Sequence, residues 1–234
     1  MIKIANLQLG NAPRIALSVS DRDTPGEIAK YKVDALELRV DSFKTLTVGR
    51  IVSKIRDFRK TRLPLILTVR SKEEGGKRHI PDGKRLFLFS SLIELVDAVD
   101  IELGSAILKD VLKIAKANRK ASIISVHDLK RTPSCAELER IFKKAKSLKG
   151  DIFKIAVTAA SYEDVSRLAL FTLTHKKDNI ISISMGSKGA VSRIFFPICG
   201  SLLTYSYINQ PKAKGQIPIS ELNRQFKLYF SNDA

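Results

Sequence analysis

The sequence predicts an α/β protein built as a (β/α)8 TIM barrel with a short N-terminal β cap. Short apolar, β-rich runs alternate with longer segments of helical apolar spacing along the chain. Eight strand–helix units fit a length of 234 residues, because such barrels often run to roughly 200–250 residues. No linker or low-complexity segment interrupts the chain, so we expect residues 1–234 to form a single domain.

The predicted strands are short runs rich in Ile, Val, Leu and Ala. In chain order they are Ile15–Ser20, Ala35–Val40, Leu65–Arg70, Ala98–Leu103, Ser122–His127, Ile152–Val157, Ile180–Met185 and Ile198–Tyr205. The predicted helices include Leu46–Lys60, Leu86–Val96, Cys135–Leu148, Tyr162–Thr174 and Ser220–Phe230. Pro25 and Pro133 stand where helices are expected to begin, since proline is tolerated in a first helical turn. The first nine residues are expected to cover the bottom of the barrel.

Composition excludes several classes of protein. Hydrophobic residues make up 44% of the chain and charged residues 28%, which is typical of a globular protein and not of a disordered one. No apolar run approaches the ~20 residues that span a bilayer. The N-terminus lacks the features of a signal peptide, and Cys135 and Cys199 lack the spacing of disulfide or metal motifs. We therefore expect a cytoplasmic protein that does not bind membranes.

The chain is strongly basic, with 41 Lys and Arg against 24 Asp and Glu, a net charge of +17. Nucleic-acid binding would require these residues on one face, preferably with aromatic residues among them. Instead they are spread along the sequence, and the dense groups Lys109–Lys120 and Lys143–Lys149 lie in helical patterns, opposite apolar stripes. We interpret them as solvated helix faces and expect no nucleic-acid partner, although an anionic small substrate would be attracted by this charge.

Charged residues occupy the face of predicted strands that points into the barrel. Glu37, Arg39 and Asp41 alternate with apolar residues, and the apolar face must meet the surrounding helices. Arg70 and His127 end two further strands in the inward register. Because buried charges are costly and barrel active sites lie at the carboxyl ends of the strands, we predict that these residues form a functional site.

Lys154 lies in the middle of a predicted strand, where a surface lysine is not expected. Burial and neighbouring cations lower the pKa of an amine and leave it neutral, so Lys154 is a candidate for Schiff-base formation with Arg39, Arg70 and Arg193 as possible neighbours. His127, on the preceding strand, is a candidate proton carrier. The other two histidines, His79 and His175, are expected on the surface, and no histidine has the spacing of a metal ligand.

Two loops complete the predicted site. The Gly-rich segment Met185–Arg193 could bind an anion, and the Arg193 guanidinium could grip a carboxylate or phosphate. The segment Gln210–Gln216 has loop composition and could fold over the site as a lid.

Together these motifs resemble the type I 3-dehydroquinate dehydratase family. The resemblance runs from Ser18 to Gln216. Its motifs, in family order, are Glu37-Leu-Arg39-Val-Asp41, Arg70-Ser-Lys-Glu-Glu74-Gly-Gly, Ser125-Val-His127-Asp128, Phe153-Lys154-Ile-Ala-Val157, Ser184-Met185-Gly186 through Ser192-Arg193, and Gly215-Gln216. The lid departs from the family, with Lys212 where a serine is frequent and Ala213-Lys214-Gly215-Gln216 in place of Ala-Pro-Gly-Gln.

The resemblance implies conversion of 3-dehydroquinate to 3-dehydroshikimate and water in the shikimate pathway. It assigns the imine to Lys154, proton transfer to His127 and orientation of that histidine to Glu74. It assigns the substrate carboxylate to Arg193, and further substrate contacts to Ser18, Glu37, Arg39, Arg70, Gln216 and, in place of the serine, Lys212. It also implies that no metal or organic cofactor is used and that the protein is a homodimer.

Two alternatives remain from the sequence. A class I aldolase acting on a sugar phosphate would also use a Schiff-base lysine in a barrel, with the Gly186–Gly189 turn binding the phosphate. The inward carboxylates and arginines of the second and third strands favour a hydroxylated carboxylate ring instead. A basic protein that binds nucleic acid is the more distant alternative, and it would leave the inward Lys154 and His127 without a purpose.

Overall fold

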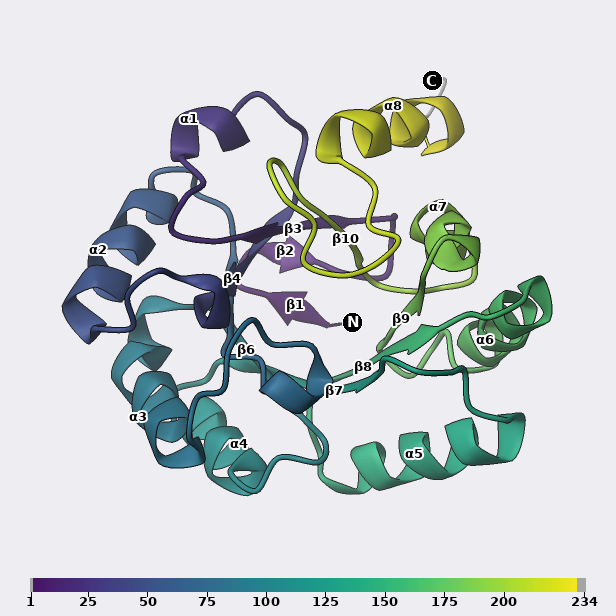
Figure 1. The fold of residues 1–234 in the computed structure, drawn as a ribbon, viewed down its shortest axis with the longest axis horizontal. Helices are drawn as coiled ribbons and strands as arrows, with labels where there is room; N and C mark the ends of the chain where they lie inside the picture. Colours follow the sequence, from purple (N-terminus) through teal and green to yellow (C-terminus); the bar gives the residue numbers. More distant parts are fainter. Residues whose placement is uncertain (1, 231–234) are drawn as a thin grey trace.

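The computed structural model describes residues 2–230. Eight parallel strands form a nearly closed barrel, surrounded by helices (Figure 1), which confirms the predicted fold class. The strands follow one another around the barrel in the order β10-β3-β4-β5-β6-β7-β8-β9. Each barrel strand therefore pairs with its neighbour in the sequence, except where β10 closes the ring against β3.

The elements alternate as the sequence predicts. The strands are β1 (Lys3–Ile4), β2 (Leu7–Gln8), β3 (Ile15–Val19), β4 (Ala35–Arg39), β5 (Leu65–Thr68), β6 (Ala98–Glu102), β7 (Ala121–Asp128), β8 (Ile152–Thr158), β9 (Ile180–Met185) and β10 (Thr204–Ser206). The α-helices are α1 (Pro25–Ile28), α2 (Val48–Arg59), α3 (Asp82–Leu92), α4 (Leu108–Ala117), α5 (Cys135–Ser147), α6 (Tyr162–Thr174), α7 (Ser192–Ile198) and α8 (Ile219–Phe230). Within residues 2–230, no helix combines the length and the apolar character needed to cross a membrane.

Two separate apolar clusters hold the barrel together. The outward side chains of the strands pack against the apolar stripes of the helices, as Leu36 and Leu38 do with Ile51 and Ile55 of α2. A second cluster fills the lower interior of the barrel. Most inward side chains at the carboxyl ends of β3 to β8 belong to neither cluster and are free to form a polar site.

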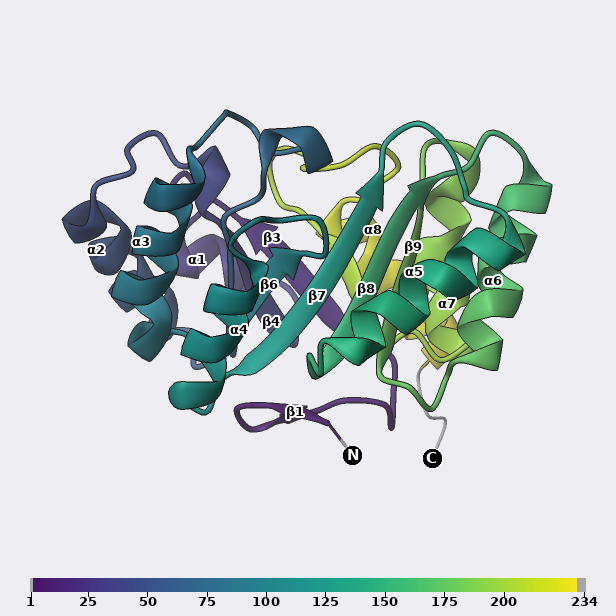
Figure 2. The same cartoon turned by 90° about the horizontal axis from the view of Figure 1, so that it is seen from below.

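The N-terminal residues form the predicted β cap. Strands β1 and β2 pair in antiparallel fashion and lie across the bottom of the barrel (Figure 2). Ile4 and Leu9 are fully buried in the lower interior cluster, beside Ile66 and Ile123. The cap excludes water from the end of the barrel opposite the site.

The eighth predicted strand, Ile198–Tyr205, was placed wrongly at its start. Ile198 ends α7, which contains Pro197, and strand β10 begins only at Thr204. The continuous apolar run before Gly200 does not distinguish a buried strand from a short buried helix. Gly200 separates the two elements with φ +105°, a conformation that favours glycine.

Hydrogen bonds from the segment before β10 connect it to β9. The amide N–H of Leu202 donates to the Ile180 carbonyl at 2.9 Å, and the Ser182 amide donates to the Ser201 hydroxyl at 3.0 Å. These two hydrogen bonds take the place of a regular β9–β10 ladder. At this point the barrel is therefore closed by the loop before β10 and the Ser201 side chain, and not by paired strands.

Of three further expectations, the structure confirms one and corrects two. Pro25 occupies the first turn of α1, where Thr24 and Glu27 form a capping box, so this helix start is confirmed. Pro133 does not lie in a first turn, because Ser134 caps α5 and the helix begins at Cys135. His175 is not a surface residue: its side chain is only 12% exposed and its ring stacks on Phe142, with centroids 4.0 Å apart.

Candidate active site

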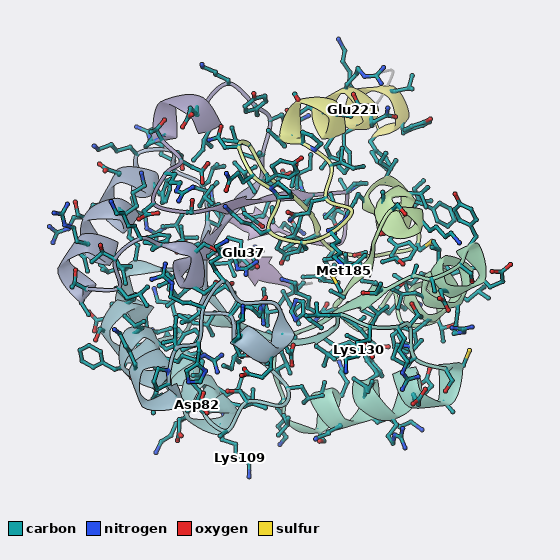
Figure 3. The ribbon with its side chains drawn as sticks, viewed as in Figure 1. Glu37, Asp82, Lys109, Lys130, Met185 and Glu221 are labelled. Carbon is teal, nitrogen blue, oxygen red and sulfur yellow. The ribbon has the colours of Figure 1, made fainter. Side chains whose placement is uncertain are left out.

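A cavity of about 470 Å³ opens at the carboxyl ends of the barrel strands, beneath the loop that joins β10 to α8. Figure 3 shows Glu37 and Met185 inside the ring of helices, whereas Asp82, Lys109 and Glu221 belong to helices of the ring itself. The cavity brings together the ten residues that the family resemblance assigns to the site: Ser18, Glu37, Arg39, Arg70, Glu74, His127, Lys154, Arg193, Lys212 and Gln216. Residues that lie up to about two hundred positions apart in the chain thus share one space because their strands are parallel.

Lys154 stands in the middle of β8 with its amine buried at the floor of the cavity. Its Nζ lies 2.8 Å from Asp100 Oδ2, 3.1 Å from Glu37 Oε1 and 4.0 Å from the centre of the Tyr205 ring. Burial alone would lower the pKa of Lys154, but the two carboxylates outweigh it and raise the pKa above its ordinary value. The amine is therefore a protonated ammonium in the unliganded site.

This result corrects the predicted surroundings of Lys154. The sequence predicted cationic neighbours that would lower the pKa of the amine, but its direct partners are the carboxylates of Glu37 and Asp100. Arg70 acts on Lys154 only from behind Asp100, to whose other oxygen it donates at 2.7 Å. Nucleophilic attack consequently requires a proton to leave Lys154 first.

An ion network beneath the cavity went unnoticed in the sequence. Asp100 and Glu102 of β6 both accept hydrogen bonds from the Arg70 guanidinium, which also donates to Ser125 at 2.7 Å. Arg85 of α3 closes the network on the second oxygen of Glu102. The signal was present, because Asp100 and Glu102 alternate with apolar residues as Glu37 and Arg39 do. The network fixes Asp100 beneath the amine.

His127, near the end of β7, pairs with Glu74 from the loop after β5. Its Nδ1 lies 2.9 Å from Glu74 Oε2, and its backbone N–H donates to the same oxygen at 2.8 Å. Burial, followed by the positive charges of Arg70 and Lys154, holds the pKa of His127 well below its ordinary value. The imidazole is neutral at pH 7, and an ionised Glu74 keeps its proton on Nδ1, leaving Nε2 as a base. Burial raises the pKa of Glu74 to about 7.

Arg193, in α7, presents an unpaired positive charge to the cavity. The residue is 1% exposed, yet its Nε and Nη2 have no hydrogen-bond partner among residues 2–230. Burial without a close counter-ion lowers the pKa of this guanidinium to about 10. A buried charge of this kind is costly unless a partner arrives, so the position is suited to an anionic group of a ligand.

The other polar residues of the cavity are held by neighbours. Ser18 donates to Glu37 Oε2 at 2.6 Å, so one carboxylate bridges β3 and the Lys154 amine. Arg39 forms two parallel hydrogen bonds of 2.9 Å with Asp41. Asp41 itself lies behind Arg39 and does not line the cavity. These contacts keep Glu37 and Arg39 oriented before any ligand binds.

The predicted lid crosses the mouth of the barrel between β10 and α8 (Figure 1). The side-chain oxygen of Gln216 accepts from the backbone amides of Lys212 and Ala213, at 2.5 and 3.2 Å, and so shapes the loop. The loop packs on the turn after β9, where the Gly186 amide donates to the backbone carbonyl of Lys214 at 3.3 Å. Gly215 has φ +74°, and a Cβ there would meet the Gly186 carbonyl at 2.3 Å.

The Gly186–Gly189 turn does not line the cavity. The Gly186 amide is already bonded to the lid, and Gly189 packs tightly against the backbone of Ser184. The turn therefore does not face the cavity as the phosphate site of an aldolase would. Within the described part of the chain, no cluster of three or more His, Cys, Asp or Glu side chains could hold a metal ion.

Comparisons with known proteins agree with this geometry. Residues 18–233 match the family model described as Type I 3-dehydroquinase. The 3-dehydroquinate dehydratase of Thermodesulfovibrio yellowstonii is 38% identical over 94% of this chain and 97% of its own length. The type I 3-dehydroquinate dehydratase of Clostridium difficile, solved with covalently modified comenic acid, is 29% identical, with a TM-score of 0.88 over 97% of this chain and 96% of its own. The 3-dehydroquinate dehydratase of Geobacillus kaustophilus is 27% identical, with a TM-score of 0.89 over 98% and 97%.

Proposed function

The chain belongs to the type I 3-dehydroquinase family, and from this premise we propose that it converts 3-dehydroquinate to 3-dehydroshikimate and water through an imine on Lys154. It is accordingly an enzyme of the hydro-lyase class. The observation that carries the covalent mechanism is the buried Lys154 amine, which shares one cavity with the neutral imidazole of His127 and the unpaired guanidinium of Arg193. Proximity of a nucleophile, a base and an anion site is what such a reaction requires.

Substrate binding begins at Arg193. Its two unpaired donor nitrogens suit the carboxylate of 3-dehydroquinate, and binding supplies the missing counter-ion. Glu37, Arg39, Arg70 and Ser18 then contact the ring hydroxyls from the opposite, charged wall of the cavity. Lys212 and Gln216 contact the substrate from the lid. The ring ketone is thereby directed at the Lys154 amine.

Imine formation starts with a proton transfer. The Lys154 ammonium gives a proton to Nε2 of His127, and the carboxylates of Glu37 and Asp100 hold the amine in place. The amine nitrogen forms a bond to the ketone carbon. The ketone oxygen takes up the proton held on Nε2 of His127 and a second proton from the lysine nitrogen, and leaves as one molecule of water, so that Nε2 is again free to act as a base. The product is a protonated imine that withdraws electrons from the adjacent carbon.

Elimination uses the same histidine. Nε2 of His127 removes a proton from C2, the carbon next to the imine, and then returns it to the hydroxyl that leaves from the following carbon as a second water. Hydrolysis of the imine consumes one water, so the balance of the reaction is the release of one. Glu74 stabilises the imidazolium and keeps its orientation through the contact at Nδ1.

Reductive trapping tests the covalent step. Borohydride is added with and without 3-dehydroquinate, followed by intact-mass and peptide mass spectrometry. The expected result is a substrate-dependent adduct on the peptide that contains Lys154, absent in Lys154→Ala and retained in Lys143→Ala, which alters an exposed lysine of α5. A folded wild-type protein that turns over substrate without any adduct would exclude the imine.

We further propose that the protein acts in the shikimate pathway, in the cytoplasm, as a homodimer. Exposed apolar side chains on α6 and α7 support the dimer: Leu170 is 66% exposed, Ile198 62% and Phe195 44%. The two helices pack side by side, so these residues offer apolar area that a second copy could cover. Light scattering on the eluting protein measures the mass, which we expect to be twice 26.0 kDa.

A further inference from the structure

A second cavity, of about 360 Å³, opens at the barrel mouth beside the first. Three segments form it: the loop after β3 with Arg22, the loop after β5 with Lys72 and Lys77, and the lid with Lys212. Neither Lys154, His127 nor Arg193 lines it, although Arg39, Gly75, Pro211 and Lys212 line both cavities. A molecule held here would share Arg39 and Lys212 with the substrate but would not contact Lys154, His127 or Arg193.

The walls of the second cavity are cationic and contain no acidic residue. Five basic side chains line it, and among residues 2–230 only Arg39 has an ion-pair partner, Asp41. Within the described part of the chain, the guanidinium of Arg22 and the amines of Lys72, Lys77 and Lys212 make no ion pair or side-chain hydrogen bond. This differs from the first cavity, where each cation except Arg193, Lys212 and Lys214 faces a carboxylate.

Two carboxylates close to the second cavity, Asp21 and Asp23, accept hydrogen bonds from neutral donors. Asp23 accepts from the amide and hydroxyl of Ser20 and from Asn209, and Asp21 accepts from the Lys44 amide. Burial, together with the charges of Arg39 and Arg22, lowers the pKa of Lys212, while Asp23 and Asp41 oppose this only in part. The five cations that line the cavity outnumber the nearby carboxylates of Asp21, Asp23 and Asp41, so positive charge is in excess at this point.

We propose that the second cavity binds a phosphate group, carried by inorganic phosphate or by a small phosphate ester. Lysine ammonium groups act on phosphate as point charges, and the Arg22 guanidinium can donate two hydrogen bonds to it. The unpaired hydroxyl of Ser42, on the same wall, adds a neutral donor. A phosphate dianion balances more of the charge of these four unpaired cations than a singly charged carboxylate would. A bound phosphate would connect the lid to the loop after β3 and to the loop after β5. The inference is independent of the proposed function.

Isothermal titration with inorganic phosphate at constant ionic strength tests the proposal, with chloride replaced in equal charge to separate binding from screening. We expect saturable binding to the wild-type protein. Affinity should fall at least tenfold in Arg22→Ala/Lys77→Ala, and hardly at all in Lys143→Ala/Lys144→Ala, which removes the same net charge from exposed positions of α5. Turnover of the first double variant without phosphate should match that of the wild type.

A second comparison locates the ligand. Arg193→Ala should retain phosphate binding, because Arg193 does not line the second cavity. Loss of binding in Arg193→Ala alone would assign phosphate to the substrate cavity and overturn the proposal, as would equal losses in the two double variants or no saturable binding at all. Glycerol 3-phosphate, titrated in the same way, shows whether an ester is accepted, and glycerol is its neutral control.

Discussion

The interior of the barrel has two layers that come from the same strands, two residues apart, and they are chemically opposite. The lower layer consists of Ala16, Ala35, Ile66, Ala98, Ile123 and Ile152. The next inward residue on each of these strands is, in the same order, Ser18, Glu37, Thr68, Asp100, Ser125 and Lys154. The lower layer packs under the N-terminal cap, whereas the upper layer forms the ion network and the floor of the cavity.

The difference shows how one set of strands serves stability and chemistry at once. The lower side chains lose contact with water and gain apolar packing, which stabilises the fold. The upper side chains lose hydration, and their charges are tolerated because nearly all are paired. Strand β9 is the exception, since its inward residues Ile181, Ile183 and Met185 are all apolar, and Ile183 and Met185 line the cavity. Variants of the two layers should therefore separate activity from stability.

The largest effect on activity is expected from Lys154→Ala. No other residue of the cavity supplies an amine on the floor, so turnover should fall by roughly 10⁴-fold or more. Steady-state turnover of 3-dehydroquinate measures this, with Lys143→Ala as the control. The same substitution leaves Glu37 and Asp100 without their shared partner, so unfolding in urea should show a loss of stability as well. Near-normal turnover would exclude Lys154 as the nucleophile.

His127→Ala should reduce kcat by roughly 10²–10⁴-fold, because the proton transfers lose their base and acid. Borohydride should still trap an adduct on Lys154, more slowly than in the wild type. His79→Ala, at an exposed position of a loop, is the matched control and should leave kcat unchanged. If His127→Ala kept the rate of the wild type, the proton carrier would have to be sought elsewhere.

Arg193→Ala should raise KM by roughly 10–100-fold with a smaller change in kcat, since a charged hydrogen bond is worth about 1.5–3 kcal/mol and its carboxylate is present in the ground and transition states alike. Arg193→Lys should recover part of the affinity, because the charge returns without the paired donors. A drop in kcat at unchanged KM would instead place Arg193 in the chemical step.

The pH dependence of kcat/KM should report Glu74, whose pKa lies at about 7. Glu74 must be ionised to keep the proton on Nδ1 of His127, so kcat/KM falls as the pH drops through 7, about tenfold per unit below it. Glu74→Gln should be slower and should lose this limb of the profile. Glu73→Gln, at the exposed neighbouring position, should keep it. An unaltered acid limb in Glu74→Gln would assign the titration to another group.

The smallest effect on activity is expected in the lower layer. Ile123→Ala removes a fully buried side chain two residues below Ser125 and should lower the free energy of unfolding by about 2–5 kcal/mol. At a temperature where the variant is folded, kcat should stay within about twofold of the wild type. Leu228→Ala, on the exposed face of α8, should change stability by less than about 0.5 kcal/mol. A large loss of kcat in Ile123→Ala would show that the layers are not independent.

The sequence predicted several charged residues at the top of the barrel interior but not the contacts that they make with one another. Glu37, Arg39 and Lys154 were recognised because a charge in an internal strand conflicts with its apolar neighbours. Asp100 and Glu102 carry the same pattern but belong to no quoted motif, and they were missed. The positions of loop residues are harder to predict from sequence. Glu74 and His127 lie fifty-three positions apart, so only the family resemblance linked them. That residues 1–234 form one domain, without nucleic acid or cofactor, stays a prediction.

The sequence by itself determined the barrel, its cap and which strand residues point inward, because alternation and helical spacing are local properties of the chain. Only the tertiary structure decided which charges meet. Lys154 was expected among arginines but lies between two carboxylates. His175 was expected at the surface but is packed on Phe142. The first residue of the eighth predicted strand, Ile198, belongs to a helix instead. Register between strands and the path of loops set these contacts, and both depend on the packing of segments far apart in the chain.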